Sequence, residues 1–160
     1  MKLTTGLILI FVSGLTYADD VLMVNSKSLS LSSATKIAQA AIAACTKKGI
    51  QIGVTVVDKQ GVVQVTLRDT IAAPITVPIS KSKAFTAVNF NTATSALGDR
   101  ANGPIGRVPG IVMAAGGLPV QVGGSLVAGV GVSGAPSGKT DEFCAQAGID
   151  AVIDDLEMSM

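Results

Sequence analysis

Hydrophobic residues recur at steps of three and four from Ala34 to Cys45, with serines before this run and two lysines and a glycine after it. The spacing predicts an amphipathic helix that one of the serines caps. From Ile50 to Leu67, apolar residues instead alternate with polar ones on both sides of a turn at residues 58–61. This alternation predicts two strands, joined where Asp58 accepts bonds from loop amides and Gly61 takes a left-handed conformation.

The second half of the chain passes between helical and glycine-rich stretches. Residues 80–100 show helical spacing with a break at residues 89–92, whereas residues 101–110 hold too much Gly and Pro for a regular element. Residues 111–114 predict a short strand, and residues 120–132 predict a hairpin that turns at Gly123 and Gly124. A last helix is expected to open near Asp141, with its inner positions at Cys144, Ala147, Ala151 and Leu156.

These elements together predict a single α/β domain of the layered α+β kind. Its sheet is expected to be mainly antiparallel, with about five strands flanked by helices. The 160 residues are 48% hydrophobic but only 3% aromatic. The core is therefore expected to consist of Val, Ile, Leu and Ala.

The first 18 residues have the pattern of a signal peptide. Lys2 precedes an apolar run at residues 7–12, and Thr16 and Ala18 are the small residues of a cleavage site. We therefore expect a leader at residues 1–18, a mature domain at residues 19–160, and a location in the periplasm or outside the cell. A membrane anchor is the alternative, but the run is far shorter than the roughly 20 residues of a spanning helix, and no later stretch predicts a membrane span.

The balance of basic and acidic residues indicates which class of partner the protein can bind. Loss of Lys2 with the leader leaves 11 basic and 11 acidic residues, without a basic run. A surface that binds nucleic acid would carry surplus Lys and Arg, so no nucleic acid is expected as a partner.

The chain has two cysteines, Cys45 and Cys144, and each falls on the apolar face of a predicted helix. In an exported protein, such a pair is expected to form a disulfide. Two buried thiols that never meet are the alternative.

No histidine occurs anywhere in the sequence, and its one tyrosine, Tyr17, leaves with the leader. Without imidazole, neither a Ser-His-Asp nor a Cys-His catalytic site can be built. A carboxylate or lysine mechanism remains open, and its candidates, Asp58, Asp69, Lys83 and Glu142, are chosen because they lie in or beside the sequence blocks that carry the family resemblance given below. Each of these side chains equally suits a surface ion pair or a helix cap.

Two glycine motifs resemble nucleotide sites. Gly129, Gly131 and Gly134 spell GxGxxG, and residues 133–140 resemble a phosphate-binding loop. The first motif lacks a helix N-terminus at its last glycine, and the second lacks its first glycine at the required spacing. Neither motif predicts a nucleotide site.

Six blocks of the sequence occur in a specific order and spacing: VVDKQG (56–61), Arg68-Asp69, SKSKAFTA (80–87), GGLPV (116–120), GVGVSG (129–134) and DEFCAQAG (141–148). Together they resemble the GlcG/HbpS-like family, which includes the C-terminal domain of PduO-type proteins. The resemblance implies the same layered fold and a homo-oligomer. It also implies that the chain binds haem or a related tetrapyrrole.

The resemblance further implies cofactor-binding residues within or beside these blocks: Arg68, Lys83, Met113, Gly116, Gly117, Ser133, Gly134 and Glu142. Arg68 and Lys83 would pair with the haem propionates, or else form salt bridges to Asp69 or Glu142. Met113 would bind the iron, with a lysine, a freed cysteine or a weak oxygen donor as alternatives. The glycines would let the backbone approach a flat ligand, or serve as turn residues.

We therefore expect an exported small-ligand-binding protein for haem or a related planar tetrapyrrole, without turnover. The alternative is an accessory protein or small enzyme of a periplasmic organic acid or alcohol oxidation pathway. Such a protein would work beside a periplasmic oxidoreductase or a sensor. A purely structural oligomer is a third hypothesis.

Overall fold

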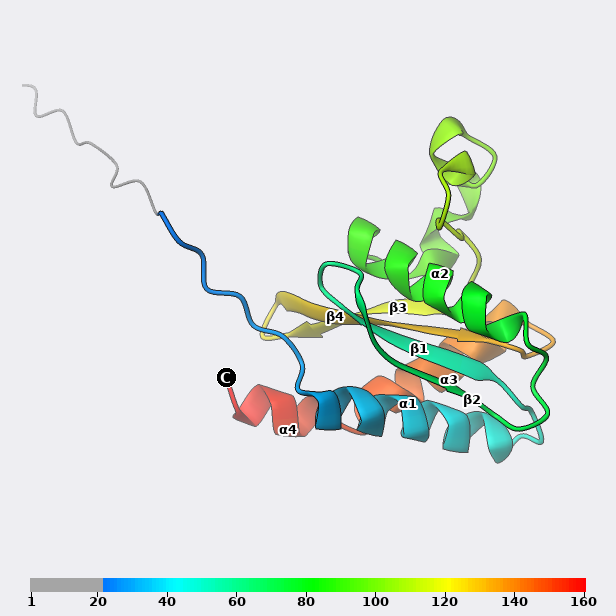
Figure 1. Ribbon diagram of the computed structural model, residues 1–160, viewed down its shortest axis with the longest axis horizontal. Coiled ribbons are helices and arrows are strands. Elements are labelled where there is room, and N and C mark those ends of the chain that lie inside the picture. The colour runs from blue at the N-terminus through cyan, green and yellow to red at the C-terminus, as the bar shows by residue number, and fades with distance from the viewer. Residues whose placement is uncertain (1–21) are drawn as a thin grey trace, which may run out of the picture.

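The strands form one antiparallel sheet in the order β2-β1-β4-β3, and helices cover both of its faces (Figure 1). The computed structural model describes residues 22–160, so the expected leader lies outside the described residues. The helices and strands are, in chain order, α1 (Leu31–Thr46), β1 (Gly53–Asp58), β2 (Val63–Arg68), α2 (Thr76–Phe90), the 3₁₀ helices η1 (Thr94–Arg100) and η2 (Pro104–Arg107), β3 (Gly117–Val122), β4 (Ser125–Ser133), α3 (Gly138–Asp150) and α4 (Ile153–Met158). Helix α2 lies on one face of the sheet, and α1 and α3 lie on the other. Within residues 22–160, no helix has the length and apolar character needed to cross a membrane.

Both predicted turns and the cap of the first helix form as expected. Asp58 Oδ1 accepts hydrogen bonds from the backbone N–H groups of Gln60 and Val62, each at 2.9 Å. Gly61 has a φ of 86°, and the turn glycines of the second hairpin have φ of 54° and 77°. Positive φ at both central residues suits the two-residue turn between β3 and β4. Helix α1 starts where the Ser30 hydroxyl accepts from the N–H of Ser33 at 3.2 Å.

The sheet has four strands, and the short strand expected at residues 111–114 does not form. Side chains bind the backbone of this segment instead. The Val112 N–H donates to Thr86 Oγ1 at 2.9 Å, and the Ala114 carbonyl accepts from Thr94 Oγ1 at 2.7 Å. Because α2 and η1 supply these partners, the segment does not need a strand ladder. The predicted single layered domain with a mainly antiparallel sheet is confirmed.

Two helix boundaries differ from the prediction. Helix α2 begins at Thr76 rather than at residue 80, because Pro78 lies in its first turn, where a missing N–H costs no hydrogen bond. The helix ends at Phe90 and Asn91 takes a φ of 46°, which confirms the predicted break. The last helix is divided, since α3 ends at Asp150 and α4 begins at Ile153.

The two faces of the sheet are chemically different. Toward α1 and α3, the sheet presents the buried valines of β1 and β4, which form the main hydrophobic core. Toward α2, it presents glycines and hydroxyl groups. Thr55 Oγ1 and Ser80 Oγ share a hydrogen bond of 2.9 Å, and a Cβ on Gly129 would lie 2.5 Å from a methyl carbon of Val88. Gly129 and Gly131, the first two glycines of the GxGxxG pattern, therefore allow α2 to approach the sheet closely.

Replacing Gly131 by alanine should destabilise the fold. The new Cβ would collide with the Ser80 carbonyl oxygen and lie 2.5 Å from the Ala84 backbone nitrogen, so α2 would have to move. We expect the free energy of unfolding in urea to fall by about 1–3 kcal/mol, the range for overpacking. Gly98→Ala is the matched control, because a Cβ at Gly98 meets no atom within 4 Å. Equal stability of the two variants would contradict this account of the sheet face.

Candidate functional site

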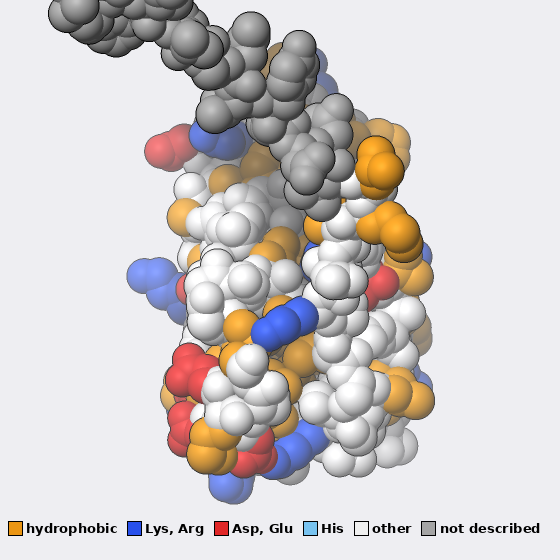
Figure 2. Space-filling model, turned by 90° about the vertical axis from the view of Figure 1, so that its left-hand side faces the viewer, with side chains coloured by type: hydrophobic (Ala, Val, Ile, Leu, Met, Phe, Trp, Pro, Cys, Tyr) orange, Lys and Arg blue, Asp and Glu red, His pale blue; other side chains and the backbone are white. Residues whose placement is uncertain are grey.

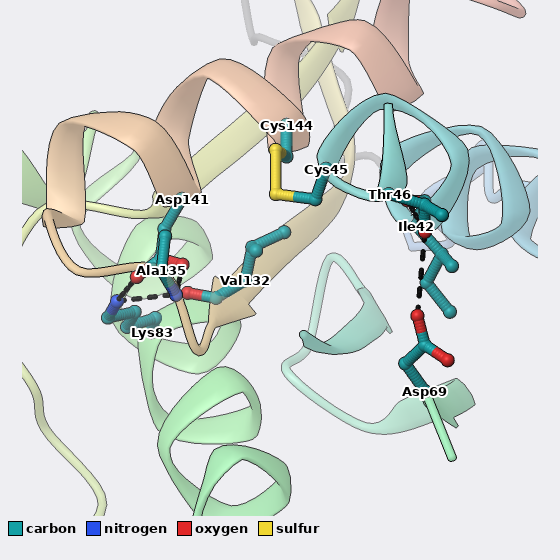
Figure 3. Close-up of a disulfide and its surroundings, with 9 residues drawn as sticks. All are labelled: Ile42, Cys45, Thr46, Asp69, Lys83, Val132, Ala135, Asp141 and Cys144. Atoms are coloured by element: carbon teal, nitrogen blue, oxygen red, sulfur yellow. Dashed lines mark hydrogen bonds and ion pairs between the residues drawn. A yellow bond between two sulfur atoms is a disulfide. The ribbon is translucent and has the colours of Figure 1, made fainter. Parts of the chain in front are cut away.

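A buried ion pair joins α2, α3 and the end of β4 (Figure 3). Lys83 Nζ donates to Asp141 Oδ2 and to the Val132 carbonyl oxygen, each at 2.9 Å. Asp141 Oδ1 accepts from the Ala135 N–H at 2.9 Å. The side chains of Lys83 and Asp141 are only 5% and 4% exposed. Each charged group is thus both paired and hydrogen-bonded, which is the condition for burying charge.

Burial raises the pKa of Asp141, while the hydrogen bonds from Lys83 and Ala135 and the charge of Lys83 act in the opposite direction. Removing water disfavours the ionised carboxylate, and here this effect exceeds the help of the cation. Lys83 was predicted to face a propionate, or to pair with Asp69 or Glu142. Its partner in the structure is Asp141, which the sequence had suggested only as the start of a helix.

Two of the candidate glycines make room for this ion pair. A Cβ on Gly116 would lie 2.7 Å from both Lys83 Nζ and the Val132 carbonyl oxygen. A Cβ on Gly117 would collide with the Lys83 carbonyl oxygen and lie 2.7 Å from Thr94 Cγ2. In the folded chain, both glycines therefore pack against protein atoms.

The other predicted residues divide between this region and the far edge of the sheet. Ser133 is 7% exposed at the end of β4, and Gly134 follows it with a φ of 134°. Met113 is 8% exposed. Arg68 lies on β2, the opposite edge strand from β3, and its guanidinium donates to the carbonyls of Thr70 and Ala72. The structure therefore gathers Lys83, Gly116, Gly117 and Glu142 in one region and leaves Arg68 outside it.

Glu142 points into a shallow groove beside this region. The groove has a volume of about 290 Å³ and is lined by Leu118, Lys139, Glu142, Phe143 and Gln146. We call it the α3–β3 groove. Glu142 Oε1 accepts from the Ser95 hydroxyl at 3.1 Å, and Oε2 accepts from the Gly116 N–H at 3.4 Å. These bonds connect the groove to η1 and to the start of β3.

Phe143 is the most distinctive side chain of the α3–β3 groove. It is 52% exposed, although the whole sequence has only four phenylalanines and a 3% aromatic content. Lys48 Nζ lies 4.4 Å from the centre of its ring. Sequence reasoning missed Phe143. The available signal was a large aromatic residue next to Cys144, one position off the inner face of the helix.

A second pocket, of about 370 Å³, lies at the end of the molecule shown in Figure 2. It is lined by residues 26–29 of the N-terminal segment, by Val122 and Val127 of the β3–β4 hairpin, and by Leu156, Ser159 and Met160 near the C-terminus. Hydrophobic side chains are visible at the bottom of a furrow in this view. None of the predicted cofactor-binding residues lines this pocket.

The predicted disulfide is present between Cys45 of α1 and Cys144 of α3, which are 99 positions apart in sequence and have their Cα atoms 5.6 Å apart (Figure 3). Cys144 follows Asp141 by about one helical turn, so the ion pair holds the first turn of α3 and the bridge holds its middle. Nearby, Asp69 Oδ2 accepts from the Thr46 hydroxyl at 3.4 Å. Asp58 and Asp69, which were open as catalytic candidates, thus both bond to local structure.

Within the described residues, no three or more His, Cys, Asp or Glu side chains cluster in a way that would hold a metal ion. The α3–β3 groove instead offers an exposed aromatic ring, an apolar neighbour and Lys139, and Lys48 lies over the aromatic ring. Such a surface suits a flat organic ligand that carries negative charge.

Comparison with known proteins points to one family. The family model described as "Haem degrading protein HbpS-like" matches residues 29–150, from the residue before the α1 cap to the end of α3. No curated protein sequence matches significantly.

Solved structures are also similar. A double mutant of HbpS from Streptomyces reticuli is 40% identical with a TM-score of 0.79, over 88% of this chain and 98% of that one. Another HbpS structure is 42% identical with a TM-score of 0.79, over 86% and 99% of the two chains. The structure titled PduOC:Heme complex is 30% identical with a TM-score of 0.72, over 78% and 94%.

Reducing the disulfide should lower stability substantially. A loop of about 100 residues contributes as much as about 4.7 kcal/mol through chain entropy, and loss of native bridges usually costs about 2–5 kcal/mol. We therefore expect Cys45→Ala/Cys144→Ala to unfold at a clearly lower urea concentration than the parent. The parent under reducing conditions should match the variant. Full thiol labelling of the native protein without reductant would show that the bridge is absent.

Replacing Lys83 by methionine should leave Asp141 as an unpaired buried carboxylate, at a cost of about 3–5 kcal/mol near neutral pH. A carboxyl whose folded pKa is raised contributes most to stability at acid pH and loses that contribution as the pH rises through its folded pKa. The variant lacks the Lys83 cation, which lowers the pKa of Asp141 in the parent. Its deficit relative to the parent should therefore be smaller at about pH 4.5 than at about pH 7.5 in urea unfolding.

The double variant Lys83→Met/Asp141→Leu is the control for this experiment. It removes both charges, so it should recover much of the lost stability and its difference from the parent should be less dependent on pH. A deficit of Lys83→Met that is the same at both pH values would contradict the assignment to Asp141.

Proposed function

The chain belongs to the HbpS-like family, which is described as haem-degrading, and we propose that it binds haem or a related tetrapyrrole. In contrast to that description, we propose that this chain binds its ligand without turnover. The observation that carries the proposal is the 40–42% identity to HbpS over 86–88% of this chain. The 30% identity to a protein solved as a heme complex adds to it.

The α3–β3 groove fits the organic part of such a ligand. The exposed face of Phe143 would stack on the flat ring, and Leu118 would add apolar contact. Lys139 at the rim and Lys48 above the phenyl ring would pair with the propionate carboxylates. The groove is shallow, so part of the ligand would project beyond this chain. When bound, haem would supply an iron centre, and these residues would bind and orient its ring.

Two observations support binding rather than turnover. The sequence has no histidine to act as a general acid or base near neutral pH. The most deeply placed pair of opposite charges, Lys83 and Asp141, is buried and bonded within itself. The alternative role is that of an accessory protein or small enzyme of a periplasmic organic acid or alcohol oxidation pathway, and an enzyme that used Lys83 would need this side chain to be free for substrate.

We further propose that the protein works outside the cytoplasm and as a homo-oligomer. The leader pattern at residues 1–18 and the Cys45–Cys144 bridge support export, because structural disulfides persist in oxidising compartments. Exposed apolar side chains such as Ile71 and Ile75, at 77% and 60%, support association between copies. A periplasmic oxidoreductase or a sensor is the kind of protein partner we propose.

Titration of the purified protein with haemin tests the binding proposal. We expect a shifted Soret band that saturates at a defined stoichiometry, and Phe143→Ala should weaken binding about tenfold, equivalent to about 1.4 kcal/mol, through loss of the stacking surface. Val62→Ala, at another exposed apolar residue, is the matched control and should bind like the parent.

Two results would reject parts of the proposal. Without any saturable spectral change, haem binding is wrong, and saturable binding that Phe143→Ala does not weaken places the site outside the α3–β3 groove. The amplitude of the Soret band should also stay constant when ascorbate is added with catalase present. Progressive loss of the Soret band in the presence of the protein, but not in its absence, would show turnover of haem.

A further inference from the structure

We infer that this protein recognises a tetrapyrrole through its ring and carboxylates and gives the central metal no side-chain ligand. Haem and the metal-free porphyrin should then bind with similar affinity. This inference rests on the proposed function and names the chemical class that the α3–β3 groove selects. It follows from the placement of every side chain of the mature chain that could bind iron well.

The two strongest classes of donor are missing. The sequence contains no histidine, so no imidazole can bind the metal. Cys45 and Cys144 are joined to each other, and the described residues hold no free cysteine. Since iron binds the thiolate form of cysteine, the bridge removes this donor as well.

The methionines of the mature chain do not reach the groove. Met113 is 8% exposed and is held in a segment whose backbone is bonded to Thr86 and Thr94. Met160 lies at the other end of β3, because its Cε is 2.9 Å from where a Cβ on Gly123 would be. Leu118 of the groove is five strand residues away from Gly123, or about 16 Å. Met158 and Met23 belong to α4 and to the N-terminal segment, which lie at that same end (Figure 1).

The lysines at the groove are better suited to carboxylates than to iron. A protonated lysine has three N–H donors and no lone pair, so Lys139 and Lys48 attract an anion and not a metal ion. Lys83 is buried against Asp141. Hydrogen bonds from Ser95 and from Gly116 hold the carboxylate of Glu142 against η1 and the start of β3. The remaining features of the groove, the phenyl ring and Leu118, interact with a macrocycle whether or not it holds a metal.

Three ligands test this inference: haemin, metal-free protoporphyrin IX, and protoporphyrin IX dimethyl ester. We expect dissociation constants for the first two within about threefold of each other, and at least about tenfold weaker binding of the ester, which has no carboxylates. Lys139→Gln should weaken haemin and protoporphyrin IX by the same factor. Lys59→Gln, which changes a half-buried lysine on the β1–β2 turn, away from the groove, should weaken neither.

The spin state of bound ferric haem is a second readout. We expect a high-spin spectrum for the complex, and conversion to a low-spin spectrum without release of haem when imidazole is added. Binding of haemin more than about tenfold tighter than protoporphyrin IX, with a low-spin spectrum before imidazole is added, would overturn the inference and leave haem binding intact. If neither porphyrin binds saturably, the proposed function fails and the inference fails with it.

Discussion

The packing around the sheet depends on the buried contact between Lys83 and Asp141. This one contact joins the middle of α2 to the first turn of α3 beside the end of β4, and it also bonds the Val132 carbonyl and the Ala135 N–H. A buried charge is tolerated only where its partners are fully supplied, so the loop after β4 and the start of α3 must adopt one arrangement. Gly116 and Gly117 follow from this requirement, because larger residues would occupy the space of the ammonium group and of the backbone of α2.

The buried ion pair also distinguishes residues that maintain the fold from residues that line the groove. The residues that the family resemblance suggested for ligand binding include several that maintain the fold, namely Lys83, Gly116 and Gly117. Glu142, by contrast, lies one residue after Asp141 and faces outward. The start of α3 thus places Asp141 in the interior, and it places Glu142 and Phe143 in the groove. A helical turn separates these roles because successive residues point about 100° apart around its axis.

Much of the fold could be predicted from the sequence, since it is encoded locally. The period of apolar residues predicted α1 and both hairpins, and Asp58, Gly61, Gly123 and Gly124 predicted their turns. The strand expected at residues 111–114 was wrong because its backbone partners, Thr86 and Thr94, are distant in sequence. The candidate site was less predictable for the same reason. The family resemblance identified Lys83 as important, but only the packing of α2 against α3 shows that its partner is Asp141.

The distance along the chain between the two cysteines has a consequence for the order of assembly. Cys45 belongs to the first helix and Cys144 to one of the last, so the covalent ring closes only after nearly all of the polypeptide has become available. Contacts of such long range are slow to form. For a polypeptide that crosses a membrane unfolded, the cross-link would be made late, on a chain whose strands have already paired. An oxidant that acted too early would find Cys45 without its native partner.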